Sequence, residues 1–267
     1  MLTGTDDGPA HRARVVVCTA EVGCGHSRAA TAIALALREA WPEADTRIVD
    51  ALESAPAWFT RPYRDGYLRL VRHVPRLTGF LYDRSDRAGP GSGLGLAVER
   101  RALRAFTSSR RVQGASVLVC THFLCARVLS AAHRAGELNA GLCVVVTDQH
   151  PHAVWRVNGA DLFVVGAEAG ASTLREHGVE AERVLVAGIP IDARFSRVPR
   201  RAAARAMHGL GGESRRVVLI SGGGLGLGGL DRALEGFLAA GTGAHAVVVC
   251  GHNAELRERL LKASEPQ

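Results

Sequence analysis

Short apolar runs, rich in β-branched residues, alternate along this chain with longer stretches in which apolar residues recur every three or four positions. The longer stretches predict helices, as at 27–39, where Ala30, Ile33 and Leu37 share one side. The short runs predict buried strands at 14–18, 46–49, 116–120, 142–146, 162–165, 184–186, 217–220 and 246–250. Such an alternation indicates parallel sheets with crossover helices, an α/β doubly wound architecture. Ligands of such sheets bind beyond the carboxyl ends of the strands, so the residues that follow each strand are the candidates for a binding site.

Two breaks interrupt the alternation. A glycine-rich stretch at 89–95 predicts a flexible loop, and a second break runs from Gly188-Ile189-Pro190 to Pro199. We expect a domain boundary near 195, with an N-terminal domain at 1–195 and the start of a second domain at 196–267. The second part holds two predicted strands, whereas a nucleotide-binding half of this type usually needs three. It therefore looks cut short.

Composition excludes several classes of protein. Hydrophobic residues make up 47% of the 267 residues and charged residues 22%, which is globular and not disordered. No apolar run is long enough to span a membrane, and the acidic start of the chain does not read as a signal peptide. The six cysteines mostly lie in or beside apolar runs and show no CxxC spacing. Buried, reduced thiols in a cytoplasmic protein are expected.

The positive charge is concentrated in one segment. The net charge is +7, and residues 60–111 hold twelve arginines against four acidic residues. Aromatic side chains lie among these arginines, which suits an anionic lipid surface and also single-stranded nucleic acid. A solvated face is the ordinary explanation of a charge run. The aromatic residues favour the membrane surface, so no nucleic-acid partner is expected. The predicted membrane-binding residues are Trp58, Phe59, Arg61, Arg64, Arg69 and Arg72.

The first predicted strand ends in Gly23-Cys24-Gly25-His26, just before a helix. Glycines at a helix start let a substrate approach the backbone, as Gly25 would here. The positive end of the helix lowers the pKa of a histidine, and a general base must be neutral. The alternative is that His26 only packs or caps the helix. A dinucleotide fingerprint fits poorly, because Arg28 stands where the third glycine belongs.

Polar residues also follow the third and fourth strands. Thr121-His122 comes after one, and a run from Thr147 to Trp155 after the other. His26, His122, Asp148, His150 and His152 are therefore expected at one sheet edge. They suit acid–base chemistry on a hydroxyl, with Trp155 as a wall, or a metal site, because His-x-His beside an aspartate can chelate. Polar strand ends held by hydrogen bonds are the third possibility.

The loop after the seventh strand, from Ser221 to Gly229, is rich in glycine. A nicotinamide cofactor is unexpected there, because the following strand ends in Cys250-Gly251-His252 with no acid for a ribose. A phosphate cradle formed by this glycine loop is one interpretation. A tight strand-to-helix turn is the other.

Taken together, these motifs resemble the family of monogalactosyldiacylglycerol synthases and processive diacylglycerol glucosyltransferases, which are GT-B glycosyltransferases. The more specific matches are the Thr-Asp-x3-His-x2-Trp element at Thr147–Trp155 and the Gly-Ile-Pro link at 188–190 with Phe195. Gly23–His26, Ser221–Gly224 and Val248–Asn253 match in the same order. The resemblance implies a GT-B fold, with a Rossmann-like N-terminal acceptor domain and the start of a second Rossmann-like domain for the nucleotide sugar.

The same resemblance implies an inverting transfer of a hexose from a UDP-sugar to diacylglycerol or a related lipid, with no bound metal or cofactor. His26 would be the base on the acceptor hydroxyl, and Asp148 and His152 would orient it or share the proton. Gly25, His122 and Trp155 would line the acceptor path, and Gly222, Gly223 and Gly224 would lie near the diphosphate. The protein would be peripheral on the inner face of the plasma membrane.

One departure from the family pattern concerns the donor side. The chain ends at Gln267, soon after the second strand of the donor domain, and the family's later sugar-gripping elements have no counterpart. We therefore expect a truncated member whose acceptor half is intact. Two other functions remain open: a non-catalytic lipid-binding remnant of such an enzyme, and a metal-dependent hydrolase that uses His122, Asp148, His150 and His152.

Overall fold

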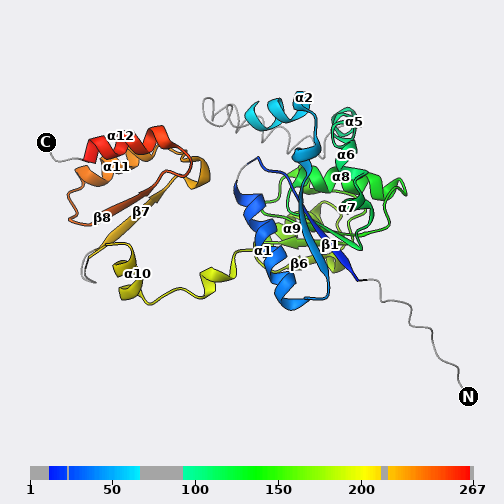
Figure 1. Cartoon of the computed structure of the whole chain (residues 1–267), viewed down its shortest axis with the longest axis horizontal. Helices are drawn as coiled ribbons and strands as arrows, with labels where there is room; N and C mark the ends of the chain where they lie inside the picture. Colours follow the sequence, from blue (N-terminus) through cyan, green and yellow to red (C-terminus); the bar gives the residue numbers. More distant parts are fainter. Residues whose placement is uncertain (1–11, 23, 67–92, 212–215, 265–267) are drawn as a thin grey trace, which may run out of the picture. The chain divides into compact units, whose positions relative to one another are not determined.

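A computed structural model describes residues 12–22, 24–66, 93–211 and 216–264 (Figure 1). The chain forms two compact units, Met1–Ala193 (unit 1) and Arg194–Gln267 (unit 2). All eight predicted strands are present, with each end within one residue of its predicted position. The strands are β1 (Arg14–Thr19), β2 (Asp45–Asp50), β3 (Val117–Cys120), β4 (Gly141–Val145), β5 (Leu162–Val165), β6 (Val184–Val186), β7 (Val217–Ser221) and β8 (His245–Val249).

Helices connect most of these strands. The longer helices are α1 (Cys24–Ala40), α5 (Gly93–Ala102), α8 (Phe123–Arg134), α9 (Glu168–Glu176), α10 (Arg201–Met207), α11 (Leu230–Ala239) and α12 (Ala254–Ser264). Shorter helical segments are α2 (Ala57–Thr60), α6 (Arg104–Thr107), α7 (Arg110–Gln113), a π-helical turn (Arg61–Gly66), and the 3-10 turns Ala51–Ser54, Ala153–Trp155, Ala181–Arg183, Ala193–Ser196 and Gly223–Leu225.

Two predictions about helices needed correction. Helix α1 begins at Cys24, three residues before its predicted start, so His26 lies in the first turn instead of preceding the helix. The glycine-rich stretch at 89–95 is not all loop, because α5 begins at Gly93; its first four residues lie outside the described part. Neither Gly93 nor Gly95 is in a left-handed conformation. Glycine can adopt helical backbone angles, and its destabilising effect in a helix comes mainly from the conformational entropy it loses.

Unit 1 is built on a parallel sheet with strand order β2-β1-β3-β4-β5-β6. Alternate strand residues face opposite helical layers, because successive side chains of a strand point to opposite faces. Val16, Cys18 and Leu118 belong to the core cluster that includes α8, and Val15 and Val17 belong to the cluster that includes α1. Both faces of the central strands are therefore buried, as a doubly wound sheet requires.

Helices α1 and α8 show why the packing is close. Helix α1 buries mainly alanines, among them Ala30 and Ala34, which let the helix approach the sheet. Helix α8 is buried along most of its length, from Leu124 to Ala132. Its one buried cation, Arg127, pairs with Glu99 of α5 at 2.8 Å. A charge in this position needs such a partner, since an unpaired buried charge is costly.

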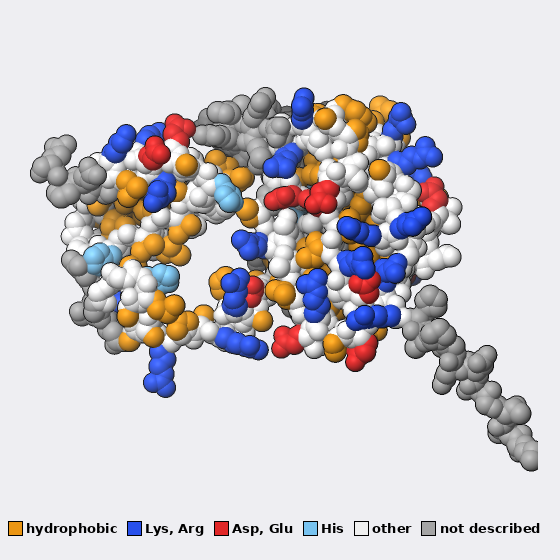
Figure 2. Space-filling view, in the orientation of Figure 1, with side chains coloured by type: hydrophobic (Ala, Val, Ile, Leu, Met, Phe, Trp, Pro, Cys, Tyr) orange, Lys and Arg blue, Asp and Glu red, His pale blue; other side chains and the backbone are white. Residues whose placement is uncertain are grey.

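In the described part of unit 2, β7 and β8 form a two-stranded parallel sheet. Helix α11 packs against both strands, and its Leu230 joins Cys250 and Leu256 in a small core. Leu219 on β7 is 65% exposed, and hydrophobic side chains gather over the strands of this unit in Figure 2. The break between the units, after Ala193, is two residues before the predicted position.

Candidate active site

Chemically capable side chains collect at one edge of the unit 1 sheet. Strands β1, β3 and β4 are neighbours and run parallel, so their carboxyl ends lie side by side. The residues that follow them are His26, the Thr121-His122 pair, and Thr147-Asp148. The expected gathering of these residues at one sheet edge is therefore what the topology produces.

His26 is held by two contacts to the neighbouring strand ends. Its Nδ1 lies 2.9 Å from the carbonyl oxygen of Thr121 and 2.8 Å from the hydroxyl oxygen of Thr147. A carbonyl oxygen only accepts hydrogen bonds, so the Thr121 contact requires a proton on Nδ1. In neutral His26 the lone pair then lies on Nε2. The Thr121 hydroxyl also donates to the carbonyl of His26, at 3.1 Å, and ties the start of α1 to the end of β3.

Burial lowers the pKa of His26 below its usual value of 6.5. The Thr121 carbonyl and the negative charge of Asp148 act in the opposite direction, because both favour the imidazolium, but burial outweighs them. His26 is therefore neutral at pH 7. The direction is the one expected for a general base, although its main cause is burial and not the helix end.

His122 begins α8 as its capping residue. Its Nδ1 accepts a hydrogen bond from the backbone N–H of Leu124 at 3.1 Å, so neutral His122 carries its proton on Nε2. Its ring meets that of His26 edge-on, with centroids 4.4 Å apart. Burial, and then the proximity of His26, hold the pKa of His122 well below its usual value. Two adjacent neutral imidazoles result.

Trp155 and Asp148 form a second fixed pair. The indole Nε1 of Trp155 donates to Oδ2 of Asp148 at 2.6 Å. The tryptophan is fully buried and its ring centroid lies 6.2 Å from that of His26. The bond orients the Asp148 carboxylate, whose charge acts on His26 through space.

The other two histidines of this run differ from each other. His152 is buried and caps the 3-10 turn Ala153–Trp155 through an Nδ1 that accepts from Val154 N–H at 3.0 Å. His150 is exposed. Within the described residues, no group of three or more His, Cys, Asp or Glu side chains is arranged to hold a metal ion. The capping bonds of His122 and His152 both use the Nδ1 atom.

Asp50 and Gly25 have different surroundings. The carboxylate of Asp50 accepts backbone N–H bonds from Glu21 and Leu52, at 3.0 and 2.8 Å. This acid at the end of β2 therefore stabilises two turns. Gly25 is exposed in the first turn of α1, and a Cβ there would meet nothing within 4 Å. The space beside it is open to a ligand.

The glycine loop of unit 2 is a compact turn between β7 and α11. A Cβ on Gly222 would strike the backbone of Gly226 and Leu227, and one on Gly226 would strike the carbonyl of Cys250. Gly223 has a left-handed φ of 63° with open space around its Cβ position. The turn interpretation accounts for Gly222 and Gly226. The proposed phosphate contact of Gly222, Gly223 and Gly224 remains a prediction.

The predicted membrane residues divide into three groups. Trp58 is 56% exposed, and Arg61 and Arg64 are exposed on the π-helical turn that follows α2. Phe59 does not face solvent: it is buried in the core and its ring stacks on Tyr63, with centroids 5.1 Å apart. Its assignment to a membrane surface is therefore wrong for this conformation. Arg69 and Arg72 lie outside the described residues.

Four further residues line the site without a role predicted from the sequence: Thr121, Thr147, Tyr63 and Phe123. The threonines hold Nδ1 of His26, and Phe123 lies between His122 and Trp155, with centroids 4.4 and 5.9 Å away. The ring centroids of Tyr63 and His122 lie 6.5 Å apart. For the threonines a signal existed, since each directly follows a strand. The contact of Tyr63 spans distant segments and has no local signal.

Comparison with known proteins assigns this site to a family. The family model for monogalactosyldiacylglycerol (MGDG) synthase matches residues 26–191, which is more than half of the chain. A processive diacylglycerol beta-glucosyltransferase of Bacillus cytotoxicus is 28% identical over 121 residues, 45% of this chain and 31% of the relative. One from Staphylococcus aureus (strain JH9) is 25% identical over 135 residues, 50% of this chain and 34% of the relative. These matches span about a third of the relatives' length.

A solved structure shows the fold over a longer stretch. The S. aureus MnaA-UDP co-structure matches 94% of this chain and 66% of that chain, with a TM-score of 0.53 and 15% identity. It supports the GT-B fold type and, at this identity, only the fold. Among the described residues, no helix is both long and apolar enough to cross a bilayer.

Proposed function

This chain belongs to the monogalactosyldiacylglycerol synthase family, and we propose that it takes part in transferring a hexose from a UDP-sugar to the hydroxyl of diacylglycerol or a related lipid. The curated relatives are named as diacylglycerol glucosyltransferases, which supports a lipid acceptor. The UDP bound in the structural neighbour agrees with a UDP-sugar donor, although that protein shares only the fold.

One observation carries the proposal: a neutral histidine with a fixed tautomer at a substrate-accessible helix start. The Thr121 carbonyl keeps the Nδ1 proton of His26 in place, so Nε2 is available to accept a proton. Gly25 leaves open space one residue away. A general base needs this combination of a free lone pair, a neutral resting state and access for the hydroxyl.

The reaction then balances without a further reactant. Nε2 of His26 accepts the proton of the lipid hydroxyl. At the same time the hydroxyl oxygen attacks the anomeric carbon of the sugar from the face opposite the UDP. The bond from the sugar to UDP breaks, UDP leaves with the electron pair, and the configuration inverts. Asp148 stabilises the imidazolium by its charge, which already favours the protonated form of His26. His152 is proposed to share the orienting role, and Trp155 to line the acceptor path.

The donor and membrane parts of the proposal rest on other segments. Gly222, Gly223 and Gly224 would lie near the diphosphate, since a glycine turn offers backbone N–H groups without side-chain obstruction. Trp58, Arg61 and Arg64 would contact anionic lipid on the inner face of the plasma membrane, because exposed aromatic and cationic side chains suit such a surface. No bound metal or cofactor enters these steps.

A second function is favoured by the extent of the match. Because the aligned region spans about a third of the curated relatives, this chain alone could bind lipid as an acceptor half without transferring sugar. Titration with UDP, followed by a transfer assay with labelled UDP-hexoses and diacylglycerol in anionic vesicles, separates the two. Saturable UDP binding with a glycolipid product supports the transferase. Vesicle binding without UDP binding supports the acceptor half.

If transfer is measurable, His26→Ala tests the base. We expect a loss of about 10²- to 10⁴-fold in kcat, with vesicle binding unchanged, because general-base catalysis is worth that much. His177→Ala is the matched control, since it removes an exposed histidine of unit 1 at the end of α9. For the unchanged enzyme, kcat/KM should rise with pH through the pKa of His26, which burial places below 6.5. Equal rates for both variants would remove His26 from the mechanism.

A further inference from the structure

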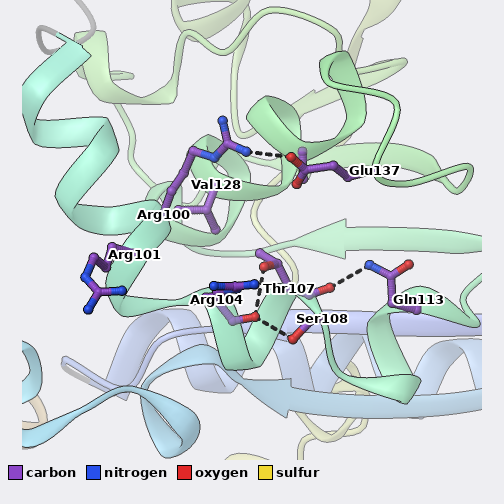
Figure 3. Close-up of a pocket in the computed structure, with 9 residues that line it drawn as sticks. Arg100, Arg101, Arg104, Thr107, Ser108, Gln113, Val128 and Glu137 are labelled. Carbon is purple, nitrogen blue, oxygen red and sulfur yellow. Dashed lines mark hydrogen bonds and ion pairs between the residues drawn. The ribbon is translucent and has the colours of Figure 1, made fainter.

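A cavity of about 570 Å³ lies on the flank of unit 1, away from the sheet edge described above. Its walls come from α5, α6 and α7 on one side and from α8 and the residues after it on the other (Figure 3). At 1.5 Å per residue, its α8 residues Val128 and Ala132 lie about 9 and 15 Å along the helix from His122. The cavity is therefore separate from the proposed reacting groups.

The charge of the cavity is strongly positive. Arg100, Arg101 and Arg104 line it, against a single carboxylate, Glu137. Arg100 and Glu137 form an ion pair at 2.7 Å, whereas no acidic side chain in the described part of the chain pairs with Arg101 or Arg104. The neighbouring Glu99 is already used, because it pairs with the buried Arg127. Two guanidinium groups thus remain for a ligand.

The polar side chains of one wall donate hydrogen bonds to backbone carbonyls. The hydroxyl of Ser108 donates to the carbonyl of Arg104 at 2.8 Å, and the Thr107 hydroxyl donates to the same carbonyl at 3.1 Å. The amide of Gln113 donates to the carbonyl of Thr107 at 2.9 Å. Figure 3 shows these bonds on the side of the cavity opposite the Arg100–Glu137 pair. The charged donors left for a ligand are the guanidinium groups of Arg101 and Arg104, which suit an anion.

The volume of the cavity and its apolar floor indicate which class of anion it could bind. Val128 and Ala132 are buried and form an apolar floor, and a dry floor strengthens the attraction between the arginines and a bound charge. The volume falls in the range of organic-ligand pockets, roughly 300–1,000 Å³, and exceeds what a bare phosphate needs. Arginine is the side chain best matched to phosphate oxygens, through paired N–H groups.

We propose that this cavity binds a phosphate ester through Arg101 and Arg104, either the headgroup of an anionic phospholipid or a soluble ester of the same chemistry. Arg100 holds Glu137 and shapes the opposite wall. The site is independent of the proposed sugar transfer, and its occupation is measured by binding alone. Failure of the transferase proposal therefore leaves it standing.

The test uses the full chain, with sn-glycerol 3-phosphate in calorimetry and phosphatidylglycerol-containing vesicles in flotation. The double variant Arg101→Gln/Arg104→Gln should weaken binding of the affected probe by about tenfold or more, since each lost charge-assisted hydrogen bond is worth roughly a tenfold change. Arg200→Gln/Arg201→Gln is the matched control: it removes the same charge from exposed positions of unit 2 and should stay within about twofold. All four arginines are exposed, so folding should be preserved, as circular dichroism would verify.

A third variant moves binding in the opposite direction. Glu137→Gln removes the one carboxylate of the cavity and frees Arg100, so affinity should rise severalfold. Losses with both probes, or with vesicles alone, assign the lipid headgroup; a loss with glycerol 3-phosphate alone assigns a soluble ester. The proposal is overturned if the unchanged chain binds neither probe, or if the double variant and its control bind both probes equally.

Discussion

The two units use the same kind of strand in different surroundings. In unit 1, β4 lies between β3 and β5, and Leu142 on it is 1% exposed. In the described part of unit 2, β7 pairs only with β8, and Leu219 on it is 65% exposed. Both strands are apolar runs that carry a leucine, and local sequence does not distinguish them. The two strands are distinguished by the number of neighbouring strands and of helices that cover them.

This difference bears on which part of the proposed mechanism can be tested. A parallel strand is usually buried on both faces, and a two-stranded sheet alone is marginal in water. The residues around His26 are supported by strands with neighbours on both sides. The glycine loop of unit 2 is supported by two strands and a core formed by Leu230, Cys250 and Leu256. The surroundings of His26 are thus the more firmly held of the two.

The largest effect should appear in native-state hydrogen exchange. Amides of β1, β3 and β4 should exchange at least about a thousandfold more slowly than those of β7 and β8, equivalent to about 4 kcal/mol in local opening free energy. The reason is that opening the central strands exposes two helical layers. Peptide-level mass spectrometry measures both sets in one sample. Equal protection would show that unit 2 is as well supported as unit 1.

A matched pair of leucine truncations sharpens the comparison. Leu142→Ala should lower the free energy of unfolding of unit 1 by about 3 kcal/mol, because it leaves a cavity, and Leu219→Ala should change that of unit 2 by less than about 1 kcal/mol. All three tryptophans lie in unit 1, so their fluorescence in urea reports that unit alone. Leu219→Ala should leave the urea midpoint of the tryptophan fluorescence unchanged. The effect of this variant on the stability of unit 2 is measured by hydrogen exchange. A comparable loss from Leu219→Ala would contradict the difference in burial.

A smaller effect is expected from pH. The pKa values of His26 and His122 lie below 6.5 in the folded chain, so below pH 6.5 the unfolded chain binds more protons than the folded one. Stability of unit 1 should therefore fall as the pH drops from 6.5 toward the folded pKa values, by up to about 1.4 kcal/mol per pH unit for each histidine, and stay level above that window.

The control for this pH dependence is a pair of asparagine variants. His122→Asn keeps a side-chain acceptor for the Leu124 N–H, because asparagine also caps helices, but it cannot titrate. In this variant, the urea midpoint of the fluorescence transition should depend less steeply on pH below 6.5. His208→Asn, at an exposed position of unit 2, should leave the slope unchanged. An unaltered slope in His122→Asn would show that burial of this ring does not set the pH dependence.

Much of the site was predictable because its residues directly follow strands. His26, His122 and Asp148 could be placed at one edge from the order of elements alone. The membrane assignment of Phe59 failed because an aromatic residue among arginines has the same pattern whether it faces lipid or a core. The capping bonds at Nδ1 of His122 and His152 were not foreseen either. Neither feature has a signature in spacing.

The sequence by itself determined the strands, the doubly wound architecture and the family, because hydrophobic periodicity and motif spacing can be recognised from residues close together in the chain. Tertiary structure decided the tautomer of His26, which depends on the carbonyl of Thr121, a residue 95 positions away in the chain. It also decided which arginines of the basic segment have partners: Arg100 meets Glu137, and Arg101 and Arg104 line a cavity with α8. Pairing and burial arise only when distant elements pack, so no reading of neighbouring residues supplies them.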